Sequence, residues 1–146
     1  MMDQVVVIES ADAMRQLGSD LAATLSIGDV VLLHGDLGAG KTTFTQGVAR
    51  TLGIEGPIQS PTFTLVREHD GDSMRLYHLD LYRLNDPAEL EDIGYEVYIS
   101  PPDGISLIEW PERADDWLPE RFLLIHIEHL GGDRRSVQIR AHGDTT

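Results

Sequence analysis

The 146-residue sequence contains no cysteine. This absence excludes a disulfide framework, a thiolate metal site and a cysteine nucleophile. Long hydrophobic runs are absent as well. The apolar run near the N-terminus covers only Val5 to Ile8, which is too short for a signal-peptide core or a membrane span. We therefore expect a cytoplasmic protein without a membrane partner.

Basic residues are scarce, since 11 lysines and arginines stand against 25 acidic residues and give a formal net charge of −14. Such a surface repels phosphate backbones, so autonomous nucleic-acid binding is disfavoured. The remaining composition, with 41% hydrophobic residues, is that of a globular protein. The length is typical of one domain, and we expect residues 1–146 to form it, with a tail that frays from about His142.

Hydrophobic periodicity and turn residues predict alternating strands and helices. Strands are expected at 5–8, 30–34, 62–68, 75–80, 105–109, 122–130 and 136–141, and helices from Ser10 to about Ser26, at 43–52 and between Asp86 and Gly94. Asp70-Gly71 and Gly131-Gly132-Asp133 are expected to join two antiparallel pairs. The predicted fold class is a single α/β domain, with a central, mostly parallel sheet that includes antiparallel strands and is flanked by helices.

The segment from Gly35 to Thr42 matches the pattern G-x-x-x-x-G-K-[ST] between a predicted strand and a predicted helix. Such a phosphate-binding loop (P-loop) directs backbone N–H groups at an anion, and its lysine reaches the β- and γ-phosphates. The threonine hydroxyl contacts Mg²⁺, so ATP and Mg²⁺ are the expected ligands. The candidate nucleotide-binding residues are Gly35, Asp36, Leu37, Gly38, Ala39, Gly40, Lys41, Thr42 and Thr43.

Two acidic residues at predicted strand ends complete the candidate chemistry, which needs one carboxylate for the metal's water shell and one group to orient the attacking water. Glu109 ends the apolar run from Ile105 to Ile108, and we assign it to Mg²⁺ through water. Asp80 is a second catalytic candidate. His78 shares a strand face with Asp80, and we expect it to hold Asp80 in place rather than to bind a metal.

Four segments in this order resemble the bacterial ATPase subunit of the tRNA threonylcarbamoyladenosine machinery: HGDLGAGKTTF, SPTFTLV, LYHLDLYRL and IEWPER. The resemblance covers most of residues 30 to 113. It implies a small P-loop ATPase that supports a threonylcarbamoyl-transferase subunit and its accessory subunit, which modify adenosine 37 of certain tRNAs. The chain would then meet tRNA only indirectly, in agreement with its acidic surface.

The same resemblance associates Glu109 with the metal and gives Thr62 a role in sensing the γ-phosphate, although Ser60-Pro61 alone reads as an ordinary turn. It also favours a functional role for Trp110, for which spacing alone favours the core. Arg83 either stabilises transition-state charge or pairs on the surface. Arg134 and Arg135 are candidates for contact with phosphate, base or partner, but a solvated turn is the favoured interpretation.

The sequence shows no arginine finger, so we expect slow hydrolysis by the isolated chain and stimulation by the transferase partner. Lys41→Ala is expected to abolish nucleotide-dependent activity without unfolding the protein, on the expectation that this lysine lies in an exposed loop. Two alternatives remain open. One is a small-molecule P-loop kinase, although no arginine-bearing lid is evident, and the other is a scaffold that binds nucleotide without turning it over.

Overall fold

The computed structural model describes residues 3–36, 38–54, 58, 65–86 and 88–143. Seven strands form one sheet. They are β1 (Asp3–Ile8), β2 (Val30–His34), β3 (Val66–Asp70), β4 (Arg75–Asp80), β5 (Gly104–Glu109), β6 (Phe122–Gly131) and β7 (Arg134–His142). The helices are α1 (Ala11–Ala22), α2 (Lys41–Leu52), α3 (Glu89–Asp92) and α4 (Glu96–Ile99), with a 3₁₀-helix at Pro111–Trp117. None of the helices in these ranges is long and apolar enough to cross a membrane.

The sheet has the order β1-β7-β6-β2-β5-β4-β3. Its centre is parallel, because β2 pairs in parallel with both β5 and β6, and β5 pairs in parallel with β4. The edges are antiparallel, with β3 against β4 on one side and β7 between β6 and β1 on the other. The predicted fold class is confirmed.

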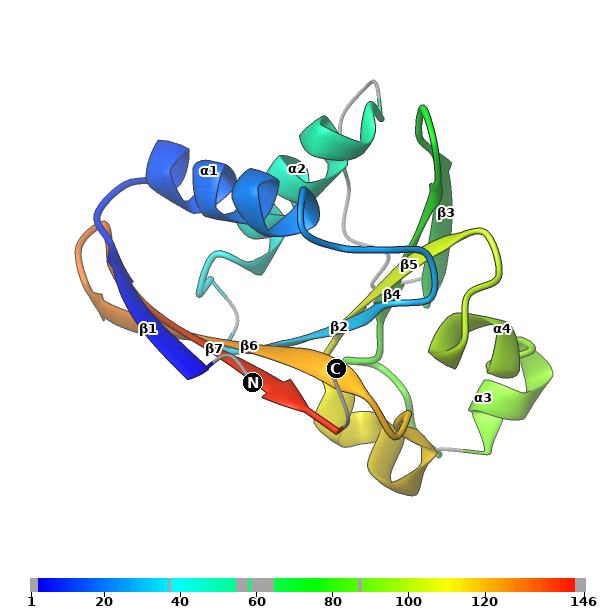
Figure 1. The fold of residues 1–146 in the computed structure, drawn as a ribbon. Coiled ribbons are helices and arrows are strands. Elements are labelled where there is room, and N and C mark those ends of the chain that lie inside the picture. Colours follow the sequence, from blue (N-terminus) through cyan, green and yellow to red (C-terminus); the bar gives the residue numbers. More distant parts are fainter. Residues whose placement is uncertain (1–2, 37, 55–57, 59–64, 87, 144–146) are drawn as a thin grey trace.

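Helices cover both faces of the central strands (Figure 1). Alternate residues of β2 show this directly, since Val31 and Leu33 belong to the core beneath α1 and α2, whereas Val30 and Leu32 belong to the core beneath α3 and α4. A strand that is buried on both faces has no face exposed to solvent, which explains why the residues of β2 from Val30 to Leu33 are all apolar. The parallel centre therefore holds the residues at its carboxyl edge on a rigid support.

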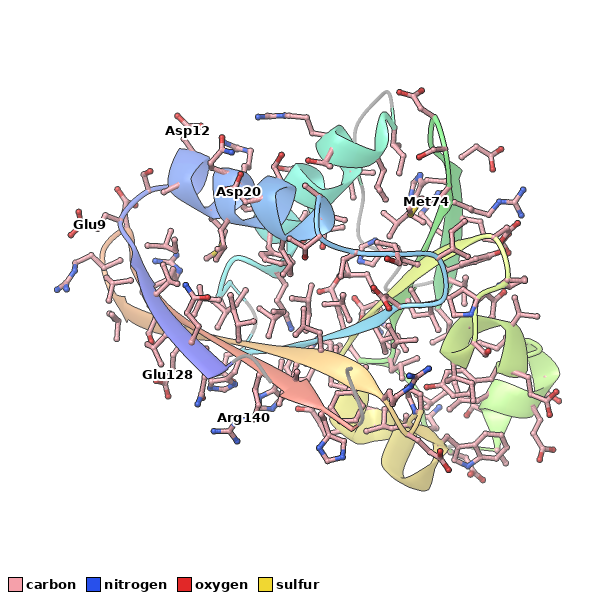
Figure 2. The ribbon with its side chains drawn as sticks, in the orientation of Figure 1. Glu9, Asp12, Asp20, Met74, Glu128 and Arg140 are labelled. Carbon is pink, nitrogen blue, oxygen red and sulfur yellow. The ribbon has the colours of Figure 1, made fainter. Side chains whose placement is uncertain are left out.

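The outer part of the sheet is covered on one face only. In Figure 2, Glu128 and Arg140 project from β6 and β7 on the side away from α1, while Asp12 and Asp20 project outward from α1 itself. Charged side chains thus mark the surfaces that the layers leave to solvent.

Helices α1 and α2 pack closely because each carries a glycine at the crossing. A Cβ atom on Gly18 would lie 2.2 Å from the carbonyl oxygen of Phe44, and one on Gly47 would lie 1.9 Å from that of Arg15. Any larger residue would separate the helices. This crossing fixes the direction in which α2 leaves the P-loop.

Local signals predicted several element ends, although α1 ends at Ala22 rather than near Ser26. Ser10 caps α1 by accepting a hydrogen bond from the Ala13 N–H at 3.1 Å, and Gly53 ends α2 with a φ of 78°. The α4 and 3₁₀ helices were not predicted. Strand β7 extends through His142, where fraying was expected to begin, and the His142 ring stacks on Phe122 with centroids 4.6 Å apart.

Candidate nucleotide-binding site

The P-loop connects β2 to α2 at the carboxyl edge of the parallel strands. Gly38 and Gly40 have φ angles of 81° and 114°, a region that side-chain-bearing residues rarely occupy. Gly35 lies against β6, where an added Cβ would approach the carbonyl oxygen of Ile127 to 2.7 Å. The sequence pattern thus corresponds to a backbone that requires glycine at all three positions.

Helix α2 begins at Lys41, and the N–H of Phe44 makes its first-turn bond to the carbonyl oxygen of Gly40 at 2.9 Å. The preceding N–H groups of the first turn have no intrahelical acceptor. Together with the positive end of the helix dipole, they form a cradle for an anion. Thr42 and Thr43 lie half-buried in this turn, Ala39 is buried, and Asp36 is exposed.

Lys41 is buried, with 5% of its surface exposed. Its Nζ donates a hydrogen bond to the carbonyl oxygen of Gly35 at 2.7 Å and lies 3.9 Å from the centroid of the Trp110 ring. The expectation that this lysine lies in an exposed loop is therefore wrong, because Trp110, from the end of β5, covers it. The ammonium group is held in place before any ligand arrives.

Burial lowers the pKa of Lys41, and the nearby carboxylates of Glu109, Asp80, Glu112 and Asp36 oppose this shift. The lysine is thus surrounded by acids at one end of the sheet. A divalent cation would offset the negative charge of these carboxylates beside a bound polyphosphate.

The lowered pKa of Lys41 predicts a pH-dependent effect of Lys41→Met on stability. Between the lowered folded-state pKa and the ordinary lysine pKa of 10.5, the unfolded chain binds more protons than the folded one, so the wild-type free energy of unfolding increases as the pH rises. The variant lacks this gain. We expect the unfolding free energy of Lys41→Met, minus that of the wild type, to decrease as pH rises through this window in urea titrations.

Arg50→Met is the control for that series, because Arg50 is an exposed cation on the same helix and stays charged over this pH range. Its difference from the wild type should stay constant with pH. A Lys41→Met difference that is equally flat would show that Lys41 is not desolvated.

Asp80 and Glu109 end the neighbouring strands β4 and β5 and face each other in the parallel register. Each is 3% exposed. The N–H of Tyr82 donates to Asp80 Oδ1 at 3.0 Å, and His78 Nε2 lies 2.6 Å from Glu109 Oε2. The hydrogen bond of His78 thus goes to Glu109, and the expectation that this histidine holds Asp80 is wrong. Both carboxylates lie beside Lys41, as its electrostatic environment shows.

Trp110 has a φ of 57°, which is unusual for a residue with a side chain. It follows Glu109 and precedes Pro111, so the chain leaves β5 through a strained turn. Its half-buried ring contacts Lys41 on one side and Tyr82 on another, with ring centroids 4.8 Å apart in the latter pair. The tryptophan is therefore a wall of the site rather than an ordinary core residue.

The expected site includes residues both outside and inside the described ranges. Leu37 and Thr62, together with the neighbouring Ser60 and Pro61, lie outside the described residues. Arg83 is exposed just after β4 and has an interaction partner.

Arg135 supports the P-loop through a contact that the sequence did not predict. Its Nε donates to the carbonyl oxygen of Ala39 in the P-loop at 2.9 Å, and its Nη1 donates to the carbonyl oxygen of Gly132 at 2.9 Å. The expected solvated turn is thus wrong for this residue. The arginine joins the β6–β7 turn to the P-loop, although the two segments are 96 residues apart in the sequence.

Arg135→Met is expected to lower the free energy of unfolding by about 1–2 kcal/mol, because a charge-assisted hydrogen bond is lost and the Ala39 carbonyl loses its partner. Nucleotide affinity should fall roughly threefold to tenfold, since the loop must then be ordered by the ligand. Thermal unfolding and calorimetric titration measure the two effects. Arg134→Met is the control, because Arg134 is exposed and lies 4.0 Å from Glu9. Equal effects of the two variants would contradict a bracing role.

The oxygen atoms available at the site suit Mg²⁺, which needs few protein ligands, better than a metal ion whose ligands all come from protein. No group of three or more His, Asp or Glu residues within the described ranges could hold a metal ion. Mg²⁺ commonly binds through one or two protein oxygens, several waters and substrate phosphates. The Thr42 hydroxyl and the Glu109 carboxylate are oxygens of that kind, located beside a ready anion cradle.

Comparisons with known proteins agree with this geometry. The family model described as "Threonylcarbamoyl adenosine biosynthesis protein TsaE" matches residues 8–137. A tRNA threonylcarbamoyladenosine biosynthesis protein TsaE from Bacillus subtilis is 44% identical over 123 residues, covering 84% of this chain and 76% of the relative. Its namesake from Nostoc sp. is 49% identical over 141 residues, covering 93% of this chain and 85% of the relative.

A solved structure shows the same architecture. The crystal structure of Bacillus subtilis YdiB superposes with a TM-score of 0.83 at 34% sequence identity, over 97% of this chain and 87% of that one. The family match spans the P-loop, Asp80, Glu109 and Arg135. With its P-loop NTPase fold, this chain belongs to the TsaE family of threonylcarbamoyl adenosine biosynthesis proteins.

Proposed function

We propose that this chain binds ATP with Mg²⁺ and hydrolyses it in support of a complex that installs threonylcarbamoyl on adenosine 37 of tRNA. The observation that carries the proposal is the convergence of the P-loop, buried Lys41, and the strand-end acids Asp80 and Glu109 on one edge of the sheet. In this proposal residues 1–146 act as one NTPase domain in the cytoplasm.

The P-loop residues would hold the phosphates. The cradle at the start of α2 supplies N–H donors, and the Lys41 ammonium group is bonded to the carbonyl oxygen of Gly35 at the start of the same loop. A ligand phosphate can replace or share the Gly35 carbonyl as the acceptor for Nζ. Because Trp110 and the protein surround this ammonium, its interaction with phosphate is screened less than it would be in water.

Thr42 and, through water, Glu109 would hold the metal. When bound, Mg²⁺ neutralises charge on the β- and γ-phosphate oxygens during phosphoryl transfer. Asp80 accepts a hydrogen bond at Oδ1 from the backbone N–H of Tyr82, and Glu109 lies opposite it at the end of the neighbouring strand. We assign Glu109 to the metal's water shell, and Asp80 or Glu109 to the orientation of the attacking water.

The proposed partners are the threonylcarbamoyl-transferase subunit and its accessory subunit. Relatives named as tRNA threonylcarbamoyladenosine biosynthesis proteins support a role in this modification. The net charge of −14 favours contact with tRNA through these partners rather than directly. Since the sequence offers no arginine finger of its own, a group supplied by the partner would raise the rate by about 10³–10⁵.

The test is steady-state hydrolysis of γ-labelled ATP with and without saturating partner complex. We expect slow release of labelled phosphate by the chain alone and strong stimulation in the mixture. Equal rates in both samples would contradict the coupling. Label in an organic product would instead support a small-molecule kinase, and binding without a single turnover in the assembled complex would support a scaffold.

A further inference from the structure

His78 is a buried side chain that the proposed function leaves without a role. None of its surface is exposed, and it lies on β4, the strand next to β5. Its Nε2 lies 2.6 Å from Glu109 Oε2, while its Nδ1 has no hydrogen-bond partner among the residues that the structure describes. A buried imidazole with one short bond to an acidic residue and one unpaired nitrogen calls for a physical account.

We propose that His78 is a positioning residue for the reaction, which donates its Nε2–H to Glu109 and fixes this carboxylate toward the P-loop. The proposal rests on the proposed function of Glu109. It deepens that function by naming the group that holds the acid in its working orientation. Residues that orient metal-associated carboxylates in this way commonly affect activity strongly.

The register of the sheet makes this contact possible. In the parallel pairing of β4 with β5, His78 lies opposite Leu107 and Asp80 lies opposite Glu109. His78 and Glu109 are thus diagonal neighbours on the same face, and a long side chain is needed to span the gap between them. Asp80 receives its hydrogen bond from the Tyr82 backbone instead. His78 is therefore a side chain that lies against Glu109, whereas the backbone of Tyr82 contacts Asp80.

The unpaired Nδ1 assigns the proton on the ring. A neutral imidazole that donates from Nε2 leaves only an unpaired lone pair at Nδ1. The reverse arrangement, in which a protonated Glu109 donates to Nε2, would leave a buried Nδ1–H without an acceptor and would also make the carboxyl group a poor partner for a cation. We therefore expect the Nε2–H tautomer beside an ionised Glu109. The bond uses Oε2, so Oε1 is the oxygen that we assign to the metal's water shell.

Three variants test the positioning role in the full chain with its partner complex. His78→Leu keeps a similar volume but removes the donor, and it should lower the single-turnover rate roughly 10- to 100-fold, while ATP affinity by calorimetry stays close to wild type. His78→Gln places an amide donor at a similar reach and should restore most of the rate. His69→Leu is the matched control, because it removes a histidine with an unpaired nitrogen from the adjacent strand β3 and should leave the rate near wild type.

A double-variant cycle separates positioning from a general effect on the fold. In a Glu109→Gln background the donor has no ionised carboxylate to hold, so adding His78→Leu should change the rate little. A loss in that background as large as in the wild type, or a failure of His78→Gln to restore activity, would overturn the proposal. Thermal unfolding of each variant identifies any loss that comes from the folded fraction.

A spectroscopic measurement tests the bond without any turnover. Nitrogen-15 NMR of the free protein should show His78 protonated at Nε2 alone, with the Nε2 signal displaced in Glu109→Gln. A ring protonated only at Nδ1 would overturn the proposal even if hydrolysis proceeds. If the wild-type complex binds ATP but performs no turnover, both the proposed function and the reaction role of His78 are overturned, whereas the same NMR result would still establish the contact.

Discussion

Lys41→Ala is expected to weaken binding of ATP with Mg²⁺ by about 100- to 1,000-fold, because two charge-assisted hydrogen bonds to phosphate contribute about 3–4 kcal/mol together. The structure strengthens this expectation. The ammonium group is already held between the Gly35 carbonyl and the Trp110 ring, so little side-chain entropy remains to be lost when a ligand binds. Isothermal titration calorimetry of the isolated chain measures the effect.

We expect the fold to remain intact after this substitution, although Lys41 is buried and not exposed. The substitution removes the hydrogen bond to Gly35 and the contact with Trp110, but it also removes a desolvated charge. Arg50→Ala, on the exposed side of the same helix, is the control and should bind like the wild type. An affinity of Lys41→Ala within fivefold of the wild type, with circular dichroism showing an intact fold, would refute phosphate binding by this lysine.

Glu109→Gln is expected to lower single-turnover hydrolysis in the assembled complex by about 10²–10⁴, the range found when a positioned acid–base group is lost. Nucleotide binding should persist or strengthen, since one negative charge near the phosphates is removed. Quenched-flow measurement of labelled phosphate gives the rate, and calorimetry gives the affinity. The substitution thus separates binding from chemistry, which Lys41→Ala cannot do.

Glu112→Gln is the matched control for that change. Glu112 also contributes a negative charge near Lys41, but it is half-exposed in the 3₁₀-helix and contacts His34 at 3.1 Å. It should leave the rate near wild type. Asp80→Asn completes the comparison. A larger loss of hydrolysis rate in Asp80→Asn than in Glu109→Gln would show that Asp80 has the principal catalytic role. Equal small losses in Glu109→Gln and Glu112→Gln would show that only net charge matters.

Local sequence signals predicted much of the fold and the central part of the site. Glycine spacing placed the P-loop between β2 and α2, and an apolar run that stops at Glu109 placed this acid at a strand end. These features depend on residues close together in the chain. Hydrophobic periodicity and the positions of glycine and proline indicate local structure of this kind.

Contacts across the sheet escaped prediction because they depend on strand order. Trp110 covers Lys41 only because β5 lies next to β2, and His78 meets Glu109 only because β4 lies next to β5 in one particular register. Pattern within a segment contains no information on either pairing. The predictions for the burial of Lys41 and the partner of His78 were therefore both wrong, whereas the predicted strand-end positions of Asp80 and Glu109 are confirmed.

The link between Arg135 and the Ala39 carbonyl has a consequence for protein synthesis. The P-loop emerges from the ribosome early, but its brace belongs to the last strand, which also pairs with the first one, β1. A nascent chain that has not yet released β7 would have the complete glycine motif without its support. We therefore expect the P-loop to reach its final order only after β7 has been synthesised and has paired with β6 and β1.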